Sequence, residues 1–110
     1  MILKTIVNDV HDNDPVKYVL CVKDVLSGIV LPWHLDTQQK QMITSMIVTL
    51  DNAAQDRIED RMLLATVDEC IANMSKLVLD SKPARATYEK FERARFTMIH
   101  IRNSLEKLLT

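Results

Sequence analysis

The scarcity of chain-breaking residues constrains the fold of this sequence more than any other feature. The 110 residues include one Gly and three Pro, whereas architectures built from many short strands need turn residues at every connection. Aromatic residues make up 5% of the chain and the hydrophobic fraction is 47%, so aliphatic side chains must fill the core. We therefore predict an all-α helical bundle in a single domain over residues 1–110.

The first predicted helix covers residues 15–27. Asp14 can cap its first turn, and Pro15 suits the first helical position because its missing N–H would have no partner there. Gly28 is expected to end this helix in a positive-φ conformation. The preceding residues 1–10 fit a helix and a short strand equally well, and both alternatives stay open.

The middle of the chain predicts two further helices. Asp36 caps the first of them, over residues 37–51. Asp51 and Asn52 are better caps than helix-interior residues, so we expect a break there and another helix over 53–79. One uninterrupted helix over the whole stretch is the alternative, although it would be unusually long.

The last predicted helix covers residues 83–109 and opens with Pro83. The short connection before it predicts an antiparallel hairpin with the preceding long helix. The two shorter helices are expected to cover this hairpin. Apolar residues along this helix alternate in spacings of three and four, which defines a buried seam. The seam consists of Phe91, Ala94, Met98, Ile101, Leu105 and Leu108.

Phe96 lies almost opposite that seam at ~100° of rotation per residue. Two readings are open: another helix of the same chain covers Phe96, or Phe96 anchors a contact with another protein, because aromatic and Arg side chains are enriched at interfaces. The second reading gives these candidate interface residues: Tyr88, Arg93, Arg95, Phe96, Ile99, Arg102 and Asn103.

The apolar connection over residues 29–36 gives a second candidate. Pro32 excludes a helix through this segment. The segment either packs as a strap across the bundle or forms an exposed docking loop, and burial is the more frequent outcome for such an apolar stretch. Its candidate contact residues are Leu31, Trp33 and His34.

The charge distribution raises a nucleic-acid alternative. Residues 82–110 carry seven Lys or Arg against three Glu, whereas residues 1–81 carry seven against twelve Asp or Glu. The basic side chains do not share one face of the helix, and we find no zinc-finger, RRM or KH pattern. Nucleic-acid association through the last helix is therefore the second hypothesis for function.

Enzymatic activity ranks third among the hypotheses for function, because no phosphate loop, nucleophile elbow or HExxH motif is visible. The acidic run suggests a metal-dependent all-α nucleotide hydrolase, although a solvated helix face explains it more simply. Its carboxylates are Asp56, Glu59, Asp60, Asp68 and Glu69. We expect no cofactor, no metal, and two reduced cysteines at positions 21 and 70.

These observations favour a small non-enzymatic regulatory or adaptor protein that acts through helix-mediated protein contacts. We expect a homodimer. The contact surface would serve self-association, a different protein partner, or both. No apolar run approaches the ~20 residues of a membrane span, and the start of the chain does not resemble a signal peptide. A cytoplasmic location is therefore expected.

Overall fold

The computed structural model describes residues 14–33, 35–80 and 85–110. These residues form four α-helices and no strand, so the predicted all-α fold is confirmed. Helix α2 (Pro15–Val25) continues into a π-helical turn, η1 (Leu26–Val30), and is followed by α3 (Thr37–Asp56), α4 (Asp60–Asp80) and α5 (Arg85–Leu109). The open question about residues 1–10 lies outside the described residues.

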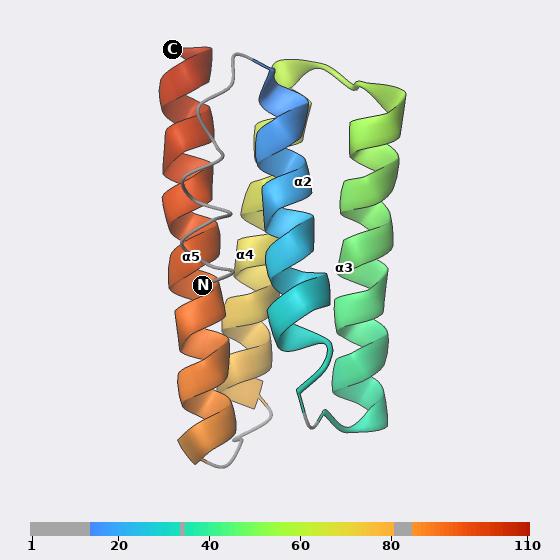
Figure 1. Cartoon of the computed structure of the whole chain (residues 1–110), viewed down its shortest axis with the longest axis vertical. Helices are drawn as coiled ribbons and strands as arrows, with labels where there is room; N and C mark the ends of the chain where they lie inside the picture. Colours follow the sequence, from blue (N-terminus) through green and yellow to red (C-terminus); the bar gives the residue numbers. More distant parts are fainter. Residues whose placement is uncertain (1–13, 34, 81–84) are drawn as a thin grey trace.

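The four helices run alternately up and down (Figure 1). Helix α4 packs against α5, α3 and α2, and α2 also packs against α3 and α5. No contact joins α3 to α5 within the described residues, so these two helices occupy opposite edges of the bundle. Helix α5 consequently has one side in the core and another side directed away from the bundle.

Both predicted N-terminal caps are confirmed. The Asp14 carboxylate accepts a hydrogen bond from the Val16 N–H at 3.1 Å, and Pro15 opens α2. At the start of α3, Asp36 Oδ1 accepts from the Gln39 N–H at 2.7 Å, while Gln39 Oε1 accepts from the Asp36 N–H at 3.1 Å. This reciprocal pair satisfies two N–H groups that a helix end leaves without partners.

The predicted end of the first helix at Gly28 is wrong. Gly28 does not have a positive φ, and the chain continues through the π-helical turn, where the Leu31 N–H donates to the Leu26 carbonyl at 2.8 Å. The turn buries Leu26 and Val30 completely. Burial of these two side chains favours continuing the helix past Gly28. Leu31 is the last residue that can join the helix, because Pro32 has no N–H to donate.

The predicted break at Asp51 and Asn52 is also wrong. Helix α3 continues to Asp56 and ends at Arg57, whose φ of 46° is left-handed. Asp51 is satisfied within the helix, because its carboxylate accepts from Lys23 Nζ on α2 at 3.0 Å. The burial of Ala53 and Ala54 then carries the helix one turn further. Residues 37–80 therefore form two helices, as predicted, with the break at Arg57.

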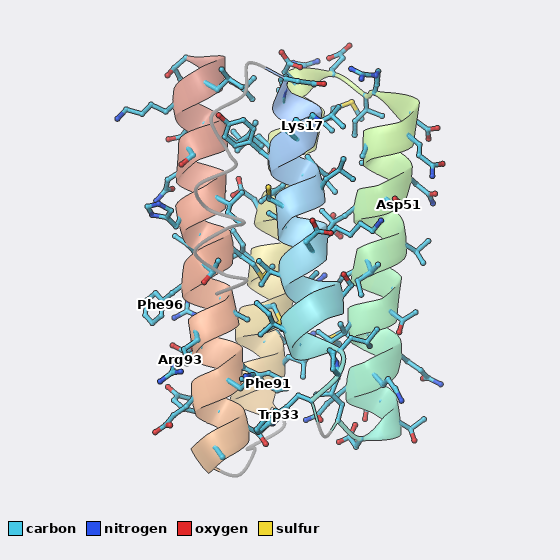
Figure 2. All side chains as sticks on the ribbon, in the orientation of Figure 1. Lys17, Trp33, Asp51, Phe91, Arg93 and Phe96 are labelled. Carbon is cyan, nitrogen blue, oxygen red and sulfur yellow. The ribbon has the colours of Figure 1, made fainter. Side chains whose placement is uncertain are left out.

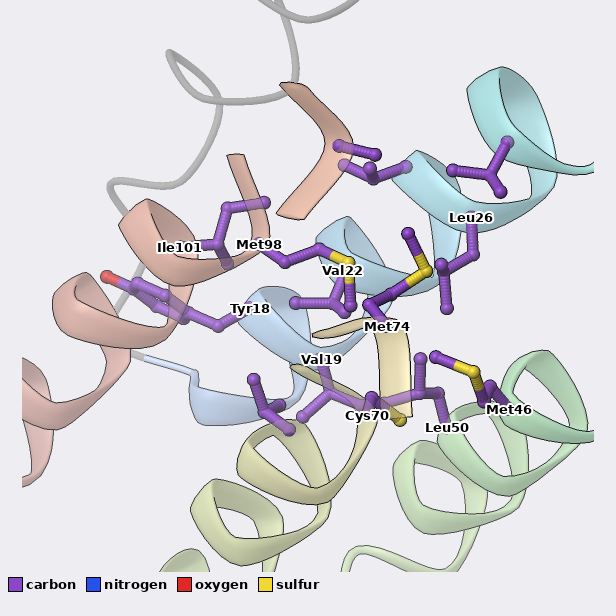
Figure 3. Close-up of a cluster of buried hydrophobic side chains, with 14 of the residues drawn as sticks. Tyr18, Val19, Val22, Leu26, Met46, Leu50, Cys70, Met74, Met98 and Ile101 are labelled. Carbon is purple, nitrogen blue, oxygen red and sulfur yellow. The ribbon is translucent and has the colours of Figure 1, made fainter. Parts of the chain in front are cut away.

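The core lies between all four helices and is mainly aliphatic and sulfur-containing (Figure 3). Val19 and Val22 of α2 are fully buried beside Leu50 of α3 and Met74 of α4. No polar or charged residue is buried among the described residues. Helices α4 and α5 run antiparallel side by side (Figure 1). Residues 81–84, which join them and include Pro83, lie outside the description, so the tight turn stays a prediction.

Candidate protein-contact surface

The inner side of α5 is the predicted seam. Phe91, Ala94, Met98, Ile101 and Leu105 are all buried, and Leu108 is half-buried against the same core. We call the five buried residues the inner seam. Their spacing of three and four places them on one side of the helix, and that side contacts α2 and α4. The inner seam is therefore sufficient to hold α5 in the bundle.

The opposite side of α5 carries an exposed aromatic side chain. Phe96 is 61% exposed, the highest fraction among the large hydrophobic side chains of the described residues. Phe96 and Arg93 both point away from the bundle, whereas Phe91 points into it (Figure 2). The Arg95 guanidinium carbon lies 5.1 Å from the centroid of the Phe96 ring, a distance at which the cation is attracted to the ring. No helix of the described chain covers Phe96.

A second set of residues on α5 repeats the same spacing of three and four. We call this set the outer stripe; it consists of Tyr88, Glu92, Arg95, Ile99, Arg102 and Glu106. Tyr88 is 46% exposed, and Ile99 is half-buried without joining the hydrophobic core. Sequence reasoning missed Glu92 and Glu106 as members, although the spacing that defines the inner seam would have found them.

The charges of the outer stripe are held in place by ion pairs. Arg95 donates two hydrogen bonds to the Glu92 carboxylate, at 2.9 and 3.0 Å. The hydrogen bond from Arg95 holds the pKa of Glu92 below its ordinary value, and the same bond raises the pKa of Arg95. This two-bond geometry fixes both side chains on the surface of the helix.

Arg102 links the outer stripe to α4. Its Nε donates to Asp68 Oδ1 at 2.7 Å, and its Nη2 lies 2.7 Å from Glu106 Oε2. Hydrogen bonding to Asp68, and then to Glu106, raises the pKa of Arg102. Arg102 also donates to the side-chain oxygen of Asn103 at 3.2 Å. A single guanidinium therefore ties together two helices.

Helix α4 contributes apolar side chains beside this link. Leu64 and Ile71 lie four residues before and three residues after Asp68, so all three share the side of α4 that meets α5. Both are half-buried. We group these three residues with Phe96 and the outer stripe as the α4–α5 face, which spans two antiparallel helices joined by the ion pair between Arg102 and Asp68. The contribution of α4 was not predicted from the sequence.

Two predicted interface residues, Arg93 and Asn103, do not belong to the outer stripe. Arg93 is exposed and has no ion-pair partner among the described residues, and Asn103 is exposed beside Arg102. The remaining predicted residues of α5 belong to the outer stripe, apart from Phe96 next to it. At ~100° per residue, the predicted interface residues extend over about half of the circumference of α5, from Arg102 beside α4 to the outward-pointing Arg93.

The described apolar residues of the predicted connection, Ile29, Val30, Leu31 and Leu35, lie against the bundle. Val30 is buried, and Leu31 is half-buried against the core. Trp33 is half-buried and donates from Nε1 to Thr87 Oγ1 on α5 at 3.2 Å, while Lys90 Nζ lies 5.0 Å from its ring centroid. His34 lies outside the described residues. The described part of the segment packs as a strap at the start of α5 (Figure 2).

The basic side chains of α5 are largely engaged with neighbouring groups. Arg95 and Arg102 bind carboxylates, and Lys90 lies over Trp33. The remaining exposed cations, such as Arg93 and Lys107, are separated along the helix. This arrangement adds no support to the nucleic-acid hypothesis.

The acidic run does not form a metal site in the part of the chain that the structure describes, because no three His, Cys, Asp or Glu side chains gather there. Asp68 binds Arg102, and Glu59 accepts from Arg61 at 3.2 Å. Burial raises the pKa of the Cys70 thiol to about 12, so this thiol is protonated at neutral pH. None of the described helices is both long enough and apolar enough to cross a bilayer.

Comparisons of this chain with protein-family models, curated proteins and solved structures find no match.

Proposed function

We propose that this chain is a non-enzymatic regulatory or adaptor module that associates with itself through the α4–α5 face. The observation that carries the proposal is Phe96, a large aromatic side chain that is 61% exposed at the middle of a well-packed helix. Leaving such a ring in water forgoes the ~1.5–3 kcal/mol that its full burial would contribute. Burial against a second protein recovers this free energy.

The surroundings of Phe96 support a protein partner. Ile99, three residues after Phe96, is half-buried on α5, and Tyr88, two turns before Phe96, is exposed on the same helix, so both add apolar area to this surface. Arg95, which lies over the ring, is held by its ion pair with Glu92, so this charge need not lose its hydration shell without compensation. Apolar anchors surrounded by satisfied polar groups are typical of protein interfaces.

The proposal is tested by light scattering over a dilution series of the wild-type chain, Phe96→Ala and Val48→Ala. Val48 is the matched control, because it is 52% exposed on α3, at the opposite edge of the bundle. We expect the wild type and Val48→Ala to associate equally. Phe96→Ala should weaken association by about 30-fold or more, which corresponds to ~2 kcal/mol for an anchor residue.

Two results would overturn this proposal. A wild-type chain that stays monomeric at every concentration would remove self-association. Equal association of all three proteins would show that a surface other than the α4–α5 face carries the contact.

A further inference from the structure

The outer stripe is arranged symmetrically about the middle of α5. The helix runs from Arg85 to Leu109, so Thr97 is its central residue. Glu92 lies five residues before this centre and Arg102 five residues after it. Residues of opposite charge therefore occupy equivalent distances from the two ends of the helix.

This symmetry selects one orientation for two copies of the helix. If two α5 helices pair antiparallel with complete overlap, each residue faces the one that lies equally far from the centre in the other copy. Glu92 then faces Arg102 of the partner subunit, Arg95 faces Ile99 of the partner subunit, and Tyr88 faces Glu106 of the partner subunit. A parallel pair would instead place Glu92 against Glu92 and Arg95 against Arg95, and such like-charge contacts are unfavourable.

From this arrangement we infer that the partner of the α4–α5 face is a second copy of the chain, docked with its α5 antiparallel so that the two-fold axis passes the outer stripe at the level of Thr97. This inference rests on the proposed function and specifies its geometry. Phe96 lies near this level at the edge of the outer stripe, so the two-fold axis places both Phe96 side chains on the same flank of the interface. Aromatic rings that approach each other there pack edge-to-face or offset.

The ion pairs within each chain remain compatible with this dimer. Arg102 has five N–H donors; it contacts Asp68 through Nε and Nη2, Glu106 through Nη2 and Asn103 through Nη1, which leaves one N–H of Nη1 for a further acceptor. A guanidinium in this position can also reach a carboxylate from another chain. The contact between Glu92 and Arg102 of the partner subunit occurs twice, once on each side of the axis, because the interface is self-complementary.

A charge exchange tests this geometry. In Glu92→Arg alone, two cations face each other at both contacts; in Arg102→Glu alone, two anions do. Each variant alone should associate at least about tenfold more weakly than the wild type, because like charges oppose each other across the interface. An equimolar mixture restores an opposite-charge pair at both contacts, and we expect it to form a heterodimer with nearly wild-type affinity. Lys40→Glu on the exposed side of α3, which changes net charge as Arg102→Glu does, is the control and should associate like the wild type.

In the Arg102→Glu variant, the new carboxylate would lie beside Asp68 and could unfold the chain. A cross-linking measurement tests the same geometry without this substitution. In a Cys21→Ser background, Arg95→Cys and Ile99→Cys lie opposite each other only in the antiparallel dimer. Mixing the two variants should yield a disulfide-linked heterodimer under mild oxidation, because the two Cα atoms must approach within about 7 Å. Each variant alone should cross-link poorly with itself.

The outcomes separate this inference from the proposed function. Association that depends on Phe96 but is not restored by the charge exchange, with each Cys variant cross-linking to itself, would contradict the antiparallel geometry and leave the α4–α5 face as the contact surface. A monomeric wild type would remove both. Restoration in the mixture together with heterodimer cross-linking would establish the antiparallel pair.

Discussion

The two sides of α5 share one spacing but differ in composition. The inner seam and the outer stripe both advance in steps of three and four residues, so each occupies one side of the helix. The five residues of the inner seam are apolar and buried. In the outer stripe each of the two apolar residues, Tyr88 and Ile99, is followed by two charged residues, and both apolar side chains are only partly covered. The spacing therefore determines which residues share a side, whereas the composition determines whether that side joins the core.

The outer stripe also satisfies its charges within one chain. Glu92 and Arg95 satisfy each other, as do Arg102 and Asp68. Each ion pair at such a partly exposed position contributes ~0–1 kcal/mol to folding, which is small against the burial of the inner seam. We infer that the outer stripe adds little to the stability of the monomer and that its apolar side chains are free to bury against a second copy.

The largest expected difference separates two adjacent residues, Met98 on the inner seam and Ile99 on the outer stripe. Met98→Ala should lower the free energy of unfolding by roughly 2–5 kcal/mol, because it leaves a cavity in a packed core. Ile99→Ala should lower it by about 1 kcal/mol or less, because Ile99 does not join the core. Urea unfolding of both variants at a dilution where the wild type is monomeric provides the measurement. Equal losses would mean that the two sides of α5 do not differ in their role.

A smaller effect tests the charges of the outer stripe. The folded-state pKa of Glu92 is lowered, mainly by the hydrogen bond from Arg95. A lowered carboxyl pKa contributes stability that is present above the unfolded-state pKa and lost as the pH falls through the folded-state pKa. The stability difference between wild type and Glu92→Gln should therefore be largest near neutral pH and disappear in acid below the folded-state pKa.

The measurement for this second prediction is urea unfolding of both proteins over a pH series, again under monomeric conditions. Met98→Ala serves as the control, since removal of an apolar side chain should lower stability by a similar amount at every pH. A gap between wild type and Glu92→Gln that stays constant into acid would show that the ion pair with Arg95 does not contribute to the fold.

Local signals were the part of the structure that the sequence could predict. Asp14 and Asp36 act on groups two or three residues away, and the inner seam is a periodic pattern within one helix. The predictions at Gly28 and Asp51 failed because contacts distant in sequence decided them. Lys23 holds Asp51 within α3, and burial of Val30 draws the chain past Gly28.

The candidate surface was predicted to a similar extent and for the same reason. Phe96, Tyr88 and Ile99 were found because they lie on one helix at known angles. The contribution of α4 depends on the antiparallel packing of Asp68 against Arg102, a contact between residues 34 positions apart. No local pattern near Leu64 or Ile71 shows that these side chains lie beside α5.

The most direct test of the α4–α5 face is the melting temperature as a function of protein concentration for wild type, Phe91→Leu and Phe96→Ala. Association of the folded state raises the melting temperature as concentration increases. We predict that the melting temperature of the wild type rises with concentration. Phe91→Leu should melt at a lower temperature with the same concentration dependence, because Phe91 is buried in the monomer. Phe96→Ala should melt close to the dilute wild type and lose the concentration dependence. A concentration dependence that persists in Phe96→Ala, or that is absent from the wild type, would contradict the assignment of the α4–α5 face as the contact surface.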